Sequence, residues 1–281
     1  MNRLSALGKA LQSQHSPENG TDTARQRGAG TEEVSRKSFA ALASPFQPQP
    51  TLQRPLRFVL PSGYEPNYKY PLVLWFHSDG YNENQISQVM PHISLQNYIG
   101  VGIRGSRSID PAGHRFDWNF SAASASRCED AVWQAIDEAA DRYSVHPQRV
   151  FLAGYAAGGS MAQRIALNHP SAFAGCISLG GRFPRGGAVL SNLAAARELP
   201  HLWAVGIDNP RLASDAFASD VDLISAARLK MEIRRYTVGD EMVREILNDV
   251  DRWIMARIHG GSQPSPPLDA WGTVEVGFSG N

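Results

Sequence analysis

Residues 149–162 read Arg-Val-Phe-Leu-Ala-Gly-Tyr-Ala-Ala-Gly-Gly-Ser-Met-Ala. The apolar run Val150–Ala153 predicts a strand, and the residues after Gly158 and Gly159 predict a helix. Gly154 and Gly158 flank the turn between them, and their lack of side chains lets the chain bend sharply there. This pattern predicts a strand–turn–helix unit in which Ala156 occupies a strained backbone position above the end of a sheet.

The same alternation of strands and helices continues on both sides of this unit. Continuous apolar runs are typical of strands that are covered on both faces of a sheet. Such runs predict strands at Leu72–Phe76, Tyr98–Ile103, Val150–Ala153, Cys176–Leu179 and Leu202–Val205, and further strands are expected at Leu56–Leu60 and Met231–Tyr236. Helical spacing of apolar residues occurs at Glu129–Tyr143, Ser160–Asn168 and Glu241–Ile258. The order predicts an α/β fold with a mostly parallel sheet, whose functional residues lie at the carboxyl ends of the strands.

Composition excludes several classes of function. The 281 residues contain 27 Lys and Arg against 27 Asp and Glu, so no excess positive charge favours nucleic acid or an anionic membrane. No apolar run approaches the roughly 18 residues that a membrane span needs. Cys128 and Cys176 are the only cysteines, and no spacing of ligands predicts a metal or a cofactor. With no secretory signal recognised, we expect a cytoplasmic protein.

Three regions follow from the distribution of residue types. Residues 1–50 contain no Trp, Tyr, Ile or Cys, so we expect a disordered segment that ends in a proline-rich linker. Residues 51–260 form the α/β domain. Residues 261–281 form a polar tail, in which Trp271 and Val274–Phe278 are the candidates for packing back onto the domain.

Three stretches at these positions resemble the α/β-hydrolase superfamily, in particular its phospholipase/carboxylesterase branch with the related feruloyl-esterase and polyhydroxybutyrate-depolymerase-like enzymes. Tyr70–Gly80 is similar to the strand of that family that ends in H-G-x-G. The turn at Ala156, continued by His169–Gly181, is similar to its nucleophile elbow, G-x-S-x-G, and the segment that follows. Tyr236–Met242 is similar to the segment that carries its catalytic histidine.

The resemblance implies a serine, a histidine and an acid that act together on an ester carbonyl. The nucleophile position is Ala156, which has no lone pair, and the base position is Asp240. A carboxylate with a pKa near 4 is a poor base for a hydroxyl group at neutral pH. The acid position is Asp208, with Asn209 as the alternative alignment.

The resemblance also implies residues around the oxyanion site. Ser78 stands where the family has glycine, while the backbone N–H of Ala157 is retained as a donor because it needs no side chain. His77 is expected to bond the backbone of its own loop, as it does in the family. Trp118 either lines the cleft or anchors its loop. An engineered Ser-to-Ala change would account for Ala156 but not for Asp240, which favours a natural non-catalytic relative.

Three functions remain open from the sequence. The first is a catalytically silent homologue that binds a small ester or acyl ligand, or a protein partner. The second is an active ester hydrolase with a rearranged nucleophile; Ser78 is the main candidate, while Ser160 is expected to point sideways from its helix. The third is a scaffold that binds partners through residues 1–50. His114 and His169 are expected in an exposed loop and at the end of a helix.

Overall fold

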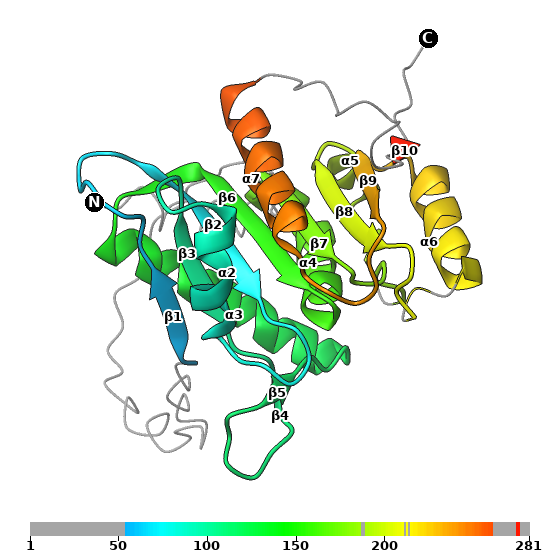
Figure 1. The fold of residues 1–281 in the computed structure, drawn as a ribbon, viewed down its shortest axis with the longest axis horizontal. Helices are drawn as coiled ribbons and strands as arrows, with labels where there is room; N and C mark the ends of the chain where they lie inside the picture. The colour runs from blue at the N-terminus through cyan, green and yellow to red at the C-terminus, as the bar shows by residue number, and fades with distance from the viewer. Residues whose placement is uncertain (1–53, 187–188, 211, 213, 261–273, 276–281) are drawn as a thin grey trace, which may run out of the picture. The chain divides into compact units, whose positions relative to one another are not determined.

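Figure 1 shows the computed structural model, which describes residues 54–186, 189–210, 212, 214–260 and 274–275. Contacts divide the chain into two units, Met1–Gln53 and Arg54–Asn281, and every described residue belongs to the second. The expected disordered segment 1–50 and most of the expected tail 261–281 therefore lie outside the described residues.

Within the described residues, the centre of the domain is an eight-stranded sheet in the order β1-β3-β2-β6-β7-β8-β9-β10 (Figure 1). The strands β3, β2, β6, β7, β8 and β9 run parallel, while β1 and β10 pair antiparallel at the two edges. This confirms the mostly parallel sheet. The bounds are β1 Leu56–Val59, β2 Tyr70–Phe76, β3 Ile99–Ile103, β6 Val145–Tyr155, β7 Gly175–Leu179, β8 His201–Gly206, β9 Met231–Tyr236 and β10 Val274–Glu275.

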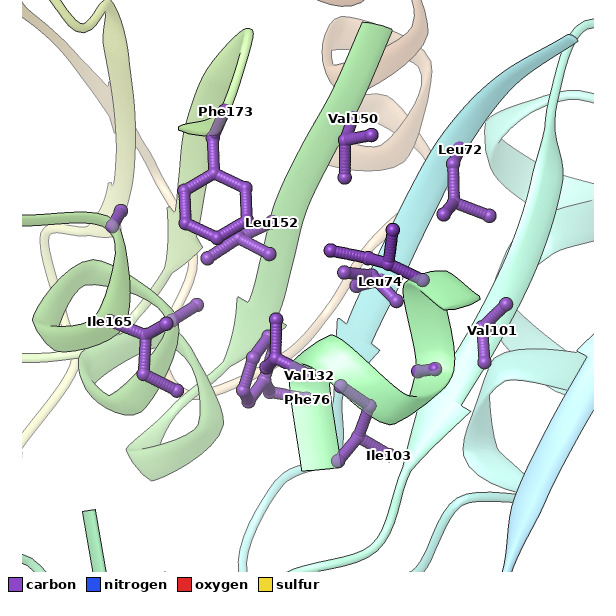
Figure 2. Packing of buried hydrophobic residues seen from close by; sticks show 14 of the residues in the cluster. Leu72, Leu74, Phe76, Val101, Ile103, Val132, Val150, Leu152, Ile165 and Phe173 are labelled. Carbon is purple, nitrogen blue, oxygen red and sulfur yellow. The ribbon is translucent and has the colours of Figure 1, made fainter. Parts of the chain in front are cut away.

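Helices cover both faces of this sheet, as an α/β fold requires. The helices α3 (Ala122–Arg142) and α4 (Ala157–Asn168) pack on one face, and α2 (Gln85–Ile93) and α7 (Arg244–His259) pack on the other (Figure 1). Figure 2 shows the core beneath α3 and α4, where Val132 and Ile165 meet side chains of the sheet. Alternate residues of β2 point to opposite faces, which explains why its whole sequence is apolar.

Several elements differ from the sequence-based expectation. The helix expected at Glu129 begins earlier, at Ala122, because the Ser121 hydroxyl accepts a hydrogen bond from the N–H of Ser124 and caps it there. The helix α2 was not predicted, since it contains Pro91. Two further helices, α5 (Leu193–Ala196) and α6 (Ser214–Ala227), and a hairpin of β4 (Arg107–Ser108) and β5 (Phe116–Asp117) were also missed.

The carboxyl ends of the parallel strands bring the predicted site residues to one edge of the sheet. The pair His77–Ser78 follows β2, Ala156 follows β6, Asp208–Asn209 follows β8, and Asp240 lies four residues beyond β9. The described helices include none long and apolar enough to cross a membrane.

Candidate active site

The turn after β6 has the bend that the sequence predicts. Ala156 has φ 52° and ψ −123°, a backbone conformation that residues with a side chain rarely adopt. Its N–H donates to the Leu179 carbonyl at 2.8 Å, and its carbonyl accepts from the Ser160 N–H at 3.2 Å. Such strain costs on the order of 1–3 kcal/mol and persists only where the surroundings impose it.

The flanking glycines are required by close packing. A Cβ atom on Gly158 would lie 2.2 Å from the Phe76 carbonyl oxygen and 2.3 Å from that of His77. A Cβ atom on Gly154 would lie 2.6 Å from the carbonyl of Gly158. The first turn of α4 therefore rests directly against the ends of β2 and β6, and this contact fixes the elbow in place.

The His77 ring is built into the loop after β2, as the resemblance implies. Its Nε2 accepts the N–H of Gly105 at 2.8 Å, so Nδ1 carries the proton and donates to the Ser78 carbonyl at 2.7 Å. Burial lowers the pKa of His77 to about 4, so the ring is neutral at pH 7. Both ring nitrogens are occupied by backbone partners, which makes His77 a structural residue.

Ser78 is held by the same loop. Its hydroxyl accepts a hydrogen bond from the Gln85 Nε2 at 2.9 Å, and its N–H donates to the Gln85 Oε1 at 3.0 Å. The same Oε1 accepts the indole N–H of Trp75 at 2.9 Å. Only 6% of Ser78 is exposed. The amide of Gln85 therefore ties β2, its following loop and α2 together, and it engages the serine that was considered as a substitute nucleophile.

Of the two expected roles of Trp118, the contacts support loop anchoring. Its indole N–H donates to the His77 carbonyl at 2.7 Å, and its ring centroid lies 4.9 Å from that of His77 and 5.4 Å from that of Phe76. Trp118 is buried as part of the core cluster beneath α3 and α4.

The two candidates for the acid position point in different directions. The side chain of Asp208 is exposed, and its N–H donates to the Val238 carbonyl at 3.1 Å. Asn209 is 4% exposed, and its Nδ2 lies 3.5 Å from the Oδ1 of Asp240. Tyr155, the residue before the elbow, donates its hydroxyl to the Asp240 carbonyl at 2.6 Å. Asp240 is therefore in contact with Asn209 and Tyr155.

A small hollow, with room for about one water molecule and partly open to solvent, lies beside Asp240. The lining has an apolar part and a polar part. Its described residues are Tyr155, Leu179, Gly180, Ala204, Gly206, Asn209, Gly239, Asp240, Glu241, Met242 and Ile246. The hollow thus opens between the ends of β6 to β9, and Ala156, Ser78 and Trp118 are not among these residues. The fold brings together Asp240, Asn209 and Tyr155. Tyr155 was not predicted, because the sequence carries no local signal for its contact with Asp240.

The remaining candidates lie away from the hollow. His114 is exposed in the β4–β5 loop, where its N–H donates to the Asp110 carboxylate. His169 ends α4, at the opposite end from Ala156, and its Nε2 lies 3.5 Å from the Glu129 carboxylate. Ser160 is buried in the first turn of α4. Within the described part of the chain, no three His, Cys, Asp or Glu side chains are placed to hold a metal ion.

Comparison with known proteins agrees with this architecture. Residues 50–230 match the family model of the putative esterases. A probable carboxylesterase SOBER1-like protein of Arabidopsis thaliana is 23% identical over 123 residues, which is 43% of this chain and 47% of that protein. The probable carboxylesterase Os04g0669500 of Oryza sativa subsp. japonica is 26% identical over 112 residues, 39% of this chain and 42% of that protein. The matches thus span about half the length of these relatives or less.

Solved structures show the same fold at low sequence identity. A Bacillus cereus carboxylesterase superposes with a TM-score of 0.58 at 15% identity, over 73% of this chain and 95% of that one. A carboxylesterase from Mesorhizobium loti gives a TM-score of 0.58 at 18% identity, over 74% and 97%. Acyl-protein thioesterase 2 of Zea mays gives 0.55 at 16%, over 73% and 99%. Because the matched family model covers more than half of the sequence, the chain belongs to the putative esterase family, with the α/β-hydrolase fold of the carboxylesterases.

Proposed function

We propose that this protein is a member of the carboxylesterase family that has lost ester hydrolysis and keeps its site for binding a small ester or acyl ligand. The observation that carries the proposal is Ala156, a methyl group at the position and in the backbone conformation of a nucleophile elbow. A methyl group has no lone pair with which to attack a carbonyl carbon. The family chemistry is therefore stopped at its first step.

The other two positions support the same conclusion. Asp240 stands at the base position, and a carboxylate is a weaker base than the imidazole of histidine for taking a proton from a hydroxyl. We assign the acid position to Asn209, because its side chain contacts Asp240 whereas that of Asp208 is exposed. An amide cannot supply the negative charge that stabilises a histidine cation. All three positions then carry groups that do not serve the reaction.

The hollow beside Asp240 is the proposed ligand site. Leu179, Met242 and Ile246 give it apolar walls, while Tyr155 and Asn209 offer polar groups for orientation. The space free in it is about 10 Å³, so a ligand larger than water enters only if the surrounding side chains move apart. We place the protein in the cytoplasm without a nucleic-acid or membrane partner, and its two free, buried cysteines suit a reducing compartment. Cell fractionation tests this location.

The alternative is an active hydrolase that uses Ser78. Its hydroxyl accepts from Gln85 and is almost fully buried, and both nitrogens of the adjacent His77 are committed to backbone partners. His77 therefore cannot act as the general base for Ser78. Labelling with a fluorophosphonate probe, followed by peptide mapping, separates the alternatives: modification of Ser78 would establish the second and contradict the first.

The decisive test is reversion of the site. Hydrolysis of p-nitrophenyl acetate and butyrate is measured for the unchanged chain, for Ala156→Ser/Asp240→His, and for the triple variant that adds Asn209→Asp. We expect the unchanged chain to match buffer and the triple variant to be the most active. The matched control adds Asp208→Asn to the triple variant, which should leave its rate unchanged because Asp208 is exposed. Hydrolysis by the unchanged chain well above buffer would refute the proposal.

A further inference from the structure

A short loop links the site to a pair of arginines. Residues 180–186, called here the β7 strap, follow β7 directly. Gly180 lines the hollow, and the Gly181 carbonyl accepts the indole N–H of Trp203 at 2.7 Å. A Cβ atom on Gly181 would lie 2.6 Å from the Ala156 carbonyl oxygen, so the strap begins in contact with the elbow. Its next residues therefore start from a fixed position.

The strap is fastened to α6 through one buried carboxylate. Asp220, which is 0% exposed, accepts from the Arg185 Nε at 2.8 Å and from the Phe183 N–H at 3.3 Å. The Arg182 Nε and Nη2 reach the same carboxylate at 3.4 Å. Arg185 also donates to the Ser219 hydroxyl at 2.8 Å. Both guanidinium groups are thus positioned side by side by a single fixed acceptor.

The two arginines carry more charge than the single carboxylate that they share. Two guanidinium groups share one carboxylate, which leaves one positive charge, and the side chains of Arg182 and Arg185 are still 45% and 47% exposed. Asp215 and Asp222 also lie on α6, but they are five residues before and two after Asp220. At 100° per residue these offsets turn their side chains away from the face that carries Asp220. Arginine forks that are held by a buried acid present their outer N–H groups in a preset geometry.

We propose that Arg182 and Arg185 form an anion-binding subsite beside α6, which takes an oxyanion group, a phosphate monoester or a carboxylate. The two guanidinium groups would donate to separate oxygens of one group, which is the geometry that arginine offers best. Arg182 is two residues from Gly180, at most about 7 Å along the chain. This subsite does not depend on the proposed loss of ester hydrolysis.

The experiment observes the arginine side chains directly. The Nε–Hε signals of the ¹⁵N-labelled full chain are followed by NMR during titration with inorganic phosphate, methyl phosphate or acetate, with chloride used to hold the ionic strength constant. We expect saturable shifts of the Arg182 and Arg185 signals with a Kd on the order of 1–10 mM for at least one of the three anions, because the pair is partly exposed and screened. Saturation by methyl phosphate assigns a phosphate ester, and saturation by acetate alone assigns a carboxylate.

Variants separate this subsite from general ionic attraction. Arg182→Gln and Arg185→Gln should each weaken binding at least about tenfold, which corresponds to 1.4 kcal/mol. Arg142→Gln is the matched control, because the Arg142 side chain is 49% exposed and pairs one to one with Glu138. It should leave the titration unchanged. The proposal is overturned if no anion gives a saturable shift, or if the control weakens binding as much as the two strap variants do.

Discussion

Replacing Gly158 by alanine tests whether the close packing at the elbow limits stability. Helix propensity alone predicts that Gly158→Ala in α4 stabilises the protein by about 1 kcal/mol. The structure predicts the opposite, because the new Cβ atom would lie 2.2 and 2.3 Å from two backbone carbonyl oxygens at the end of β2. Both contacts are about 1 Å too short, and backbone atoms cannot rotate away as a side chain can.

Overpacking of this kind costs typically 1–3 kcal/mol, and sometimes more. Because two rigid contacts are involved, we expect a steric cost of about 4 kcal/mol. Subtracting the gain in helix propensity leaves a decrease of about 3 kcal/mol in the free energy of unfolding. For a domain of this size, that lowers the melting temperature by about 6–12 °C. Urea unfolding followed by tryptophan fluorescence gives the free energy directly.

Ser126→Ala, at an exposed position of α3, is the control for helix propensity without a clash. It should be neutral or slightly stabilising. A Gly158→Ala variant as stable as the wild type would refute the reasoning, because it would mean that α4 can move away from β2 without cost.

Three further predictions concern buried polar groups. Burial lowers the pKa of His77 and of His201 to about 4, so below pH 6.5 the unfolded chain binds more protons than the native state does. The free energy of unfolding should therefore fall from pH 6.5 toward pH 4 by up to about 1.4 kcal/mol per pH unit for each histidine. Urea titrations that show no loss of stability by pH 5 would contradict this. Gln85→Leu leaves the indole N–H of Trp75 without its acceptor and should cost about 3 kcal/mol in the same unfolding assay. Asp220→Asn removes the charge that fastens the β7 strap and should cost about 2 kcal/mol, with faster hydrogen exchange confined to the strap; unchanged exchange would count against that role.

Much of the fold could be predicted because its strands are marked by composition alone. The run Leu72–Phe76 is apolar at every position, since both faces of β2 are covered, and its short length favours a strand over a buried helix. The helix α2 could not be predicted in the same way. Pro91 lies inside it, and it packs most extensively against α7, which follows much later in the chain.

The candidate site was predictable in position but not in detail. Ala156, expected from the strand end and its glycines, and Asp240, expected from the resemblance, both lie at the carboxyl edge of the sheet. The sequence analysis took Asp208 as the acid position and Asn209 as the alternative, and the contact that leads us to propose Asn209 could not be foreseen, because no periodicity fixes which residue of a loop turns inward. The contact of Tyr155 with Asp240 spans 85 residues, so only the folded chain reveals it.

The bend at residue 156 is imposed by its neighbours, and this has a genetic consequence. Since Gly154, Gly158 and the strap hold the backbone, the codon at position 156 can drift without altering the shape of the turn. Alanine and serine codons differ by one nucleotide, as do those of aspartate and histidine, and of asparagine and aspartate. Each of the three positions that we assign to the reaction is thus a single base change from the group that the reaction needs. If ester hydrolysis has been lost as we propose, the glycines still hold the backbone that a regained serine would need.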